Sequence, residues 1–240
     1  MRQSREENAT TVVTIFVNPR QFNEASDYTK YPRNEARDVA ISADEGADIV
    51  FAPSVEEVYP PGFDTTVRVG SIGEPLEGAA RPGHFEGVAT VVAILFNLVG
   101  AERAYFGQKD AQQLLVIRQM ARDLAISTEV LAHPTVREPD GLALSSRNVH
   151  LSEAERAAAP VVRRALLAAR DLWQSGERSA DALRDAMRRE LATEQLATVD
   201  YVSVSDGTTL RELERVDGEA LLSMAVRFGT TRLIDNEPLP

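Results

Sequence analysis

The chain of 240 residues contains no cysteine, only three histidines and no apolar run long enough to cross a membrane. The absence of cysteine excludes disulfide bonds and thiol chemistry. Residues 1–8 lack the apolar core of a signal peptide. The histidines, His84, His133 and His150, are not spaced as metal ligands on one element, so a zinc site is not expected. We therefore expect a cytoplasmic protein that does not insert into a membrane.

Acidic residues outnumber basic ones, which gives a net charge of −11 and an isoelectric point near 4.9. This balance disfavours nucleic acid as a partner, because phosphate tracts require clustered Lys and Arg. A small anionic substrate held by a few focused cations is still compatible with it. Arg81, Lys109 and Arg147 lie beside turn-forming or glycine-containing segments and are candidates for the walls of such a pocket.

Short apolar runs alternate with helical patterns through the first 150 residues. The runs cover residues 11–17, 48–52, 104–106 and 128–132. The run after Thr11 is apolar almost throughout, which is typical of a strand covered on both faces in a parallel sheet. The alternation predicts βαβ crossovers, and hence an α/β fold with a doubly wound parallel sheet.

The pattern changes near residue 150. Ser152 and Glu155 form a predicted capping box before a helical pattern, in which Pro160 predicts a kink or a break. A further helix is expected over residues 183–191, and the alternation over residues 222–228 predicts a half-buried strand. We therefore predict two domains, residues 1–150 and a smaller α+β domain of residues 151–240.

In open α/β sheets, ligands bind beyond the carboxyl ends of the strands. The first segment at such a position is residues 18–22, where Pro19 disfavours continued strand pairing. Gln21 offers both a donor and an acceptor, which suits the hydroxyl and carboxylate of a hydroxy acid. The alternative is an ordinary loop with an exposed Gln21.

The second segment runs from Gly107 to Gln113, between a strand and a helix. Asp110 and Gln113 fit a capping box, and Gly107 permits close approach of a ligand to the backbone. The N-terminus of a helix favours anions, and Lys109 adds a charge, so the segment is a candidate phosphate site. The alternative is a plain capped helix with a solvated Lys109.

The third segment covers residues 137–148 and begins with a strong turn signal at Pro139-Asp140-Gly141. Ser145, Ser146 and Arg147 then supply two hydroxyls and a fork-shaped cation, a set that suits a triphosphate. The alternative is a capping loop ahead of the helix that starts near Ser152.

Taken together, these segments resemble the pantothenate synthetase family over essentially the whole chain. The matching runs are residues 15–22, 31–33, 81–88, 106–113 and 136–148, in the same order and at the same spacing. The resemblance implies a Rossmann-like nucleotide-binding domain with a smaller C-terminal domain, in a protein that is usually a homodimer.

The resemblance also implies an activity. The family makes a pantoyl adenylate from pantoate and ATP with release of pyrophosphate and a requirement for Mg²⁺, and β-alanine then displaces AMP. Gln21 and Gln113 would hold pantoate, while Tyr31, Arg81 and His84 are candidates for the pocket wall. Lys109 and Arg147 would supply catalytic positive charge. The residues implied to line the ATP site are Gly107, Gln108, Lys109, Asp110, Val136, Leu144, Ser145, Ser146 and Arg147.

One departure from the family concerns its His-x-Gly-His turn, to which His84, His133 and His150 do not correspond. Residues 2–8 resemble what normally follows that turn. Our leading hypothesis is a true synthetase whose start lies upstream of Met1 or whose N-terminal segment has been cut off, and we expect the chain as written to be severely impaired. The alternative is a truncated, non-catalytic paralogue that binds pantoate or dimerises.

Overall fold

The computed structural model describes residues 1–23, 28–29 and 31–240, and it divides into two compact units. The first unit comprises Met1–Phe106 and Val116–Leu131, and the second comprises Gly107–Leu115 and Ala132–Pro240. The division falls within one helix and two strands, so these elements contribute to both units. The predicted boundary between two domains at residue 150 stays a prediction.

Helices and short strands alternate in the first unit, as the sequence predicts. Its elements are α1 (Arg2–Glu7), β1 (Val12–Thr14), η1 (Pro19–Gln21), α3 (Glu35–Asp44), β2 (Ile49–Phe51), α4 (Val55–Val58), η2 (Ser71–Gly73), α5 (Glu77–Ala80), α6 (His84–Val99) and β3 (Arg103–Gly107), with parts of α7 (Ala111–Asp123) and β4 (Glu129–His133). β1 pairs in parallel with β2, and β3 pairs with β4. The predicted α/β class is confirmed.

The first strand is shorter than the apolar run that predicts it. β1 ends at Thr14, although the backbone N–H of Ile15 still donates to Phe51 O at 2.9 Å. Asn18 and Pro19 then begin the 3-10 turn η1, in which the Asn18 side chain accepts a bond from the backbone N–H of Arg20. Proline cannot donate to a sheet ladder, so the chain leaves the sheet before it.

Helix α6 forms the centre of the first unit. Its sequence is apolar nearly all round, and its side chains from Phe85 to Ala93 are largely buried. The ring of Phe96 packs edge-to-face against Phe106 of β3, with centroids 6.3 Å apart. The helix ends at Gly100, whose φ of 61° is the left-handed conformation that glycine adopts without strain.

The second unit contains the remaining elements. They are η3 (Gln108–Asp110), η4 (Ser146–His150), α8 (Glu153–Ala158), α9 (Val161–Gln174), α10 (Ala180–Leu191), β5 (Ala197–Asp206), β6 (Ala220–Phe228) and β7 (Thr231–Leu239). The predicted capping box is present, because Ser152 N donates to Glu155 Oε2 and Glu155 N donates to Ser152 Oγ. The predicted break is also present, since Pro160 separates α8 from α9.

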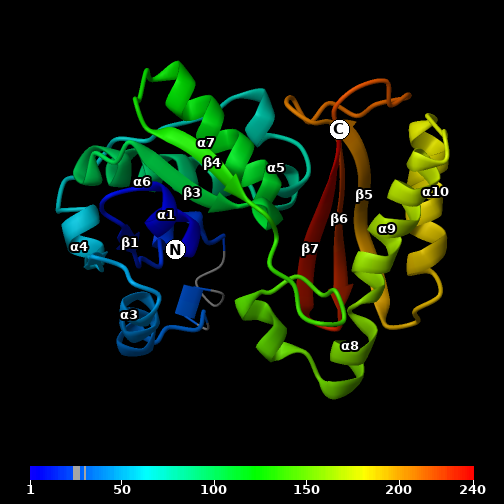
Figure 1. Cartoon of the computed structure of the whole chain (residues 1–240), viewed down its shortest axis with the longest axis horizontal. Coiled ribbons are helices and arrows are strands. Elements are labelled where there is room, and N and C mark those ends of the chain that lie inside the picture. The colour runs from blue at the N-terminus through cyan, green and yellow to red at the C-terminus, as the bar shows by residue number, and fades with distance from the viewer. Residues whose placement is uncertain (24–27, 30) are drawn as a thin grey trace. The chain divides into compact units, whose positions relative to one another are not determined.

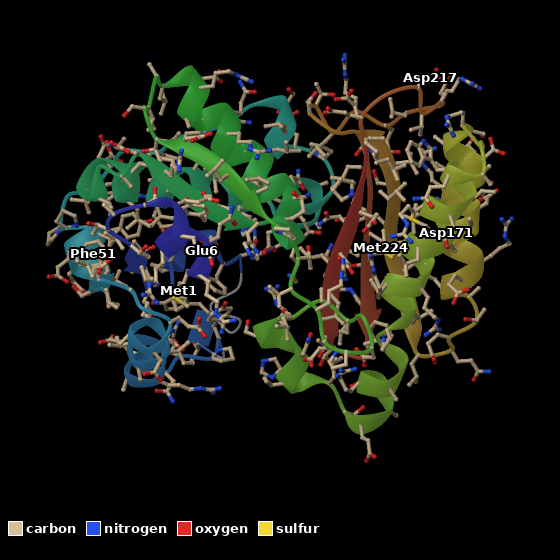
Figure 2. The ribbon with its side chains drawn as sticks, in the orientation of Figure 1. Met1, Glu6, Phe51, Asp171, Asp217 and Met224 are labelled. Atoms are coloured by element: carbon tan, nitrogen blue, oxygen red, sulfur yellow. The ribbon has the colours of Figure 1, made fainter. Side chains whose placement is uncertain are left out.

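Strands β5, β6 and β7 form an antiparallel sheet, and α9 and α10 lie along one of its faces (Figure 1). The core between them includes Leu183 and Met187 of α10 together with Met224 of β6, which Figure 2 labels. Helix–strand packing of this kind removes apolar surface from water and provides the main driving force for folding of the unit.

The prediction of a half-buried strand over residues 222–228 is wrong in one respect. β6 is present, but it is buried on both faces, with Ser223 and Ala225 buried as well as Met224. β6 is the central strand of its sheet. The face that points away from the helices carries small residues, and the sequence alone does not distinguish such a face from an exposed one.

A tight turn follows β5 and is organised by one carboxylate. Asp206 Oδ1 accepts bonds from the backbone N–H groups of Thr208 and Thr209 at 3.1 and 2.7 Å, and from their hydroxyls at 2.8 and 2.7 Å. These bonds, those from Thr209 above all, lower the pKa of Asp206 from its ordinary 3.8 to about 2. The ionised carboxylate therefore stabilises the folded chain above the ordinary pKa, and this stabilisation is lost as the pH falls toward about 2.

Replacement of Asp206 by Asn should therefore destabilise the protein in a pH-dependent manner. We expect a loss of about 1 kcal/mol in the free energy of unfolding near neutral pH, after allowance for solvent screening, and a smaller difference toward pH 2. Urea unfolding of wild type and variant between pH 7 and about pH 2 measures this difference in the free energy of unfolding. Asp217→Asn, at an exposed carboxylate paired with Arg215, is the control. A difference for Asp206→Asn that is constant with pH would contradict the assignment.

Replacement of Leu183 by Ala should open a cavity between α10 and the sheet. Leu183 is fully buried, so we expect a loss of about 2–5 kcal/mol in the free energy of unfolding. Leu196→Ala is the control, because Leu196 is exposed and its truncation should change the stability by less than about 0.5 kcal/mol. Equal effects of the two variants in thermal unfolding would show that Leu183 is not a core residue.

Candidate functional site

The three predicted ligand segments all follow strands. η1 comes after β1, η3 comes directly after β3, and the loop that leads to η4 comes after β4. Gln21, Tyr31, Arg81 and His84 belong to the first unit, while the segments around Lys109 and Arg147 belong to the second. The candidate residues therefore form two groups, one in each unit.

In the first unit, Arg81 and His84 converge on the backbone of Gln21. Arg81 Nη2 and His84 Nδ1 both bond to Gln21 O, at 3.1 and 2.8 Å, and Arg81 Nη1 lies 3.2 Å from His84 Nε2. A carbonyl oxygen only accepts and a guanidinium only donates, so these contacts require His84 with a proton on Nδ1 and a lone pair on Nε2. The imidazole is therefore neutral in this arrangement.

The side chain of Gln21 is oriented by Asn18, which is 2% exposed. Asn18 Nδ2 donates to Gln21 Oε1 at 3.3 Å and to Gly87 O at 3.0 Å, while Asn18 Oδ1 accepts from the hydroxyl of Tyr59 at 2.8 Å. Burial raises the pKa of Tyr59 to about 12 against the opposing effect of the Arg20 charge. Tyr59 therefore stays a neutral hydrogen-bond donor throughout the physiological range of pH.

Helix α6 approaches η1 very closely at Gly87. A Cβ at this position would lie 2.3 Å from Arg20 O and 2.8 Å from Gln21 N, so no other residue fits without movement of the backbone. On the other side, the guanidinium of Arg20 lies 5.4 Å from the centre of the Tyr59 ring. The turn that carries Gln21 is thus fixed on both sides.

Tyr31 joins the same neighbourhood through an aromatic contact. Its ring lies edge-to-face on Phe22, with centroids 5.4 Å apart, and Phe22 directly follows Gln21. The structure therefore brings Gln21, Arg81 and His84 together, and it links Tyr31 to them through the neighbouring ring of Phe22. Asn18 and Tyr59, which orient Gln21, were not singled out, and Tyr59 gives no local signal because it lies 41 positions from Asn18.

In the second unit, Lys109 lies in η3. Its side chain is 17% exposed, and its ammonium lies 3.6 Å from a carboxylate oxygen of Asp110. The sequence predicts Asp110 as a helix cap; in the structure it is the last residue of η3 and directly precedes α7, with Gln113 in the first turn of that helix. The capping bond itself stays a prediction. Gly107 has an ordinary φ of −71° and open space where a Cβ would stand, so neither backbone strain nor packing requires glycine there.

The loop after β4 folds back on itself over residues 136–144. Leu144 N donates to Val136 O at 2.9 Å, and Glu138 N donates to Leu142 O at 2.8 Å. The predicted turn at Pro139-Asp140-Gly141 is present, with Gly141 at a φ of +91°. The side chains of Val136 and Leu144 are both exposed, which leaves an apolar surface beside a polar segment.

η4 carries the serines and the arginine that the sequence predicts as phosphate ligands. Ser145 Oγ accepts from the backbone N–H of Arg147 at 3.2 Å, and Ser146 begins the 3-10 turn. Asn148 Nδ2 donates to Ala143 O at 3.1 Å and so ties η4 to the folded loop. Both η3 and η4 contact β7. The segments with Lys109 and Arg147 therefore lie against one strand.

Two further residues of β7, Asp235 and Asn236, contact these segments and were not singled out from the sequence. Asp235 and Asn236 could have been noticed as two consecutive polar residues in a segment that forms a strand. The structure shows that this strand is buried over most of its length. Buried polar groups need partners, so such a pair in a strand indicates a specific network.

No cluster of three or more His, Cys, Asp or Glu side chains suited to a metal ion occurs among the described residues. A magnesium ion that arrives with a nucleotide is held largely by phosphate oxygens and water, with one or two protein carboxylates at most. The described residues therefore fit a nucleotide-borne ion better than a permanent metal centre.

Comparison with known proteins gives a consistent family assignment. The family model for pantoate–β-alanine ligase matches residues 1–238. A pantothenate synthetase from Roseiflexus castenholzii is 58% identical over 236 residues, which cover 98% of this chain and 85% of the relative.

Two solved structures agree with this assignment. The crystal structure of pantothenate synthetase from Thermus thermophilus is 49% identical with a TM-score of 0.95, over 98% of this chain and 86% of that one. A pantoate–β-alanine ligase from Francisella tularensis, complexed with β,γ-ATP and β-alanine, is 32% identical with a TM-score of 0.77, over 98% of this chain and 82% of that one. The chain belongs to the pantoate–β-alanine ligase family.

Proposed function

We propose that the chain condenses pantoate with β-alanine at the expense of ATP, through a pantoyl adenylate. The family match over residues 1–238 is the observation that carries this proposal. ATP as the co-substrate is supported by the complex of the Francisella relative, which contains β,γ-ATP together with β-alanine.

In the first step, a carboxylate oxygen of pantoate attacks the α-phosphorus of ATP, the bond to the β-phosphate breaks, and pyrophosphate leaves. In the second step, the amine of β-alanine attacks the acyl carbon, the bond to AMP breaks, and an amide forms with loss of the amine proton. The protein supplies no covalent nucleophile. Its contribution is therefore orientation of the reactants and positive charge where negative charge develops.

The first-unit residues are suited to pantoate. Gln21 would bind the hydroxy acid, because its amide both donates and accepts and because Asn18 fixes its orientation. Arg81 adds positive charge beside Gln21 and is held there by its bonds to Gln21 O and to the His84 ring. Tyr31 would form part of the pocket wall. Gln113 of α7, which belongs to the second unit, is proposed as a second amide for pantoate.

The second-unit residues are suited to ATP. Lys109 and Arg147 would bind phosphate oxygens and stabilise the charge that develops during adenylate transfer. Gly107, Gln108, Asp110 and the two serines Ser145 and Ser146 would line the phosphates, while the Val136 backbone and Leu144 would contact the rest of the nucleotide. Mg²⁺, when bound with ATP, would supply further positive charge to the phosphate oxygens.

Two finer predictions accompany this proposal. The homodimer implied by the resemblance and the cytoplasmic location expected from the sequence both stay predictions. In the described ranges, no helix combines the length and apolar character needed to cross a membrane. The alternative, a non-catalytic protein that binds pantoate or dimerises, is not favoured by relatives that are named as enzymes at 58% identity.

Removal of the Lys109 ammonium should slow adenylate formation. We expect Lys109→Ala to lower the rate of pantoate-dependent pyrophosphate release by about 100-fold, the effect of losing one charge-stabilising donor. A single-turnover assay with enzyme in excess is suited to a slow enzyme. Arg122→Ala, at an exposed arginine of α7, is the control and should leave the rate unchanged. Pantoate binding without any pyrophosphate release by the wild type would instead identify a non-catalytic binder.

Removal of the Gln21 amide should weaken pantoate binding while ATP binding is unaffected. We expect Gln21→Ala to raise the dissociation constant of pantoate by about 10-fold, the effect of losing one or two hydrogen bonds. Calorimetric titration with each ligand measures the two affinities. Gln119→Ala changes a partly exposed glutamine of α7 that bonds to Asp123, and it serves as the control. Unchanged pantoate affinity in Gln21→Ala would remove Gln21 from the proposed pocket.

A further inference from the structure

Strand β7 contains two consecutive buried polar residues, Asp235 at 3% and Asn236 at 4% exposed. Removing such groups from water is unfavourable unless they form hydrogen bonds within the protein. The hydrogen-bond partners of Asp235 and Asn236 therefore indicate their role, because a fully bonded polar network fixes the positions of the groups that it joins.

Asn236 uses its whole carboxamide on the segment that carries Lys109. Its Nδ2 donates to Gln108 O and to Lys109 O, both at 2.9 Å, and its Oδ1 accepts from Gln108 Nε2 at 3.2 Å. Two donors and one acceptor on one planar group are needed for this set. Aspartate lacks the donors, and glutamine is longer by one methylene.

Asp235 holds the other nucleotide segment. It accepts two bonds from the guanidinium of Arg137, at 2.6 and 3.0 Å, and a third from the backbone N–H of Asn236 at 2.8 Å. Arg137 also donates to Gly141 O at 3.1 Å, within the folded loop that bears Val136 and Leu144. The bidentate pair is rigid because both partners are planar.

We propose that Asp235 and Asn236 are positioning residues for the nucleotide, which set η3 with Lys109 and the loop of residues 136–144 at fixed places along one strand. This inference rests on the proposed function, since it takes those two segments as the ATP-binding ones. Neither residue touches the reacting atoms in this scheme. Each acts through backbone or side-chain groups that it holds.

The same strand offers a matched control. Glu237, the next residue, pairs with Arg163 and, at 3.2 Å, with Arg170 of α9. Its side chain is 17% exposed, so it too is a largely shielded carboxylate that holds another element to β7. Its partners lie outside both nucleotide segments. Loss of its charge therefore weakens the attachment of α9 to β7, while the bonds of Asn236 to η3 and of Asp235 to Arg137 are kept.

The test uses the full chain and measures the dissociation constants of ATP and pantoate by calorimetry, together with the melting temperature. Asn236→Asp replaces two donors by a carboxylate that repels both carbonyls, and Asp235→Asn removes the charge that pairs with Arg137. We expect each to raise the dissociation constant of ATP by about 10-fold or more and to leave that of pantoate within about twofold. We expect Glu237→Gln to lower the melting temperature while ATP affinity stays within about twofold of wild type.

The outcomes separate this inference from the proposed function. Wild type that binds no ATP would contradict the proposed function itself. Wild type that binds ATP, with the same affinity in Asn236→Asp and Glu237→Gln, would overturn the positioning role alone. If Asn236→Asp does not fold, Asn236→Gln decides, because it keeps the amide but moves it by one methylene. We expect it to weaken ATP binding several-fold, and wild-type affinity there would contradict the proposal.

Discussion

In each unit, the local structure of the candidate residues depends on a buried carboxamide that binds backbone carbonyl groups. Asn18 donates to Gly87 O and orients Gln21, and Asn236 donates to the carbonyls of Gln108 and Lys109. A buried amide that lacks hydrogen-bond partners is unfavourable by about 1–3 kcal/mol. Movement of either turn away from its Asn would therefore have this unfavourable free energy. The short turns that carry candidate binding residues are thereby fixed, η1 against helix α6 and η3 against strand β7.

Local signals allowed much of the fold to be predicted. The Ser152 cap, the break at Pro160 and the turn at Gly141 each follow from a few adjacent residues, and all are present. Contacts over long separations were not predictable in this way. Asn236 meets Gln108 across 128 positions, and nothing in either local pattern specifies the other. The burial of Ser223 was missed for a related reason. The alternation of polar and apolar residues along a strand does not reveal whether that strand is central or at the edge of its sheet.

Electrostatics in this protein are local. The chain has a net charge of −11, yet the candidate phosphate ligand Lys109 lies beside a single carboxylate, that of Asp110, and is itself mostly shielded from water. An acidic surface disfavours adventitious polyanions, while a cation in a shielded position attracts a phosphate more strongly than one in bulk solvent. Such a distribution suits discrimination of a small nucleotide from longer nucleic acids, and it agrees with the family to which the chain belongs.

The contact at Gly87 limits how this protein can be redesigned. Helix α6 and the turn η1 are in direct backbone contact at Gly87, so they cannot approach each other more closely. Redesign of the proposed pantoate pocket would have to act through neighbouring side chains such as Arg81, which bonds to Gln21 O, or Tyr31, which packs on Phe22. Saturation libraries at position 87 would yield glycine alone, whereas those neighbouring positions remain open to variation.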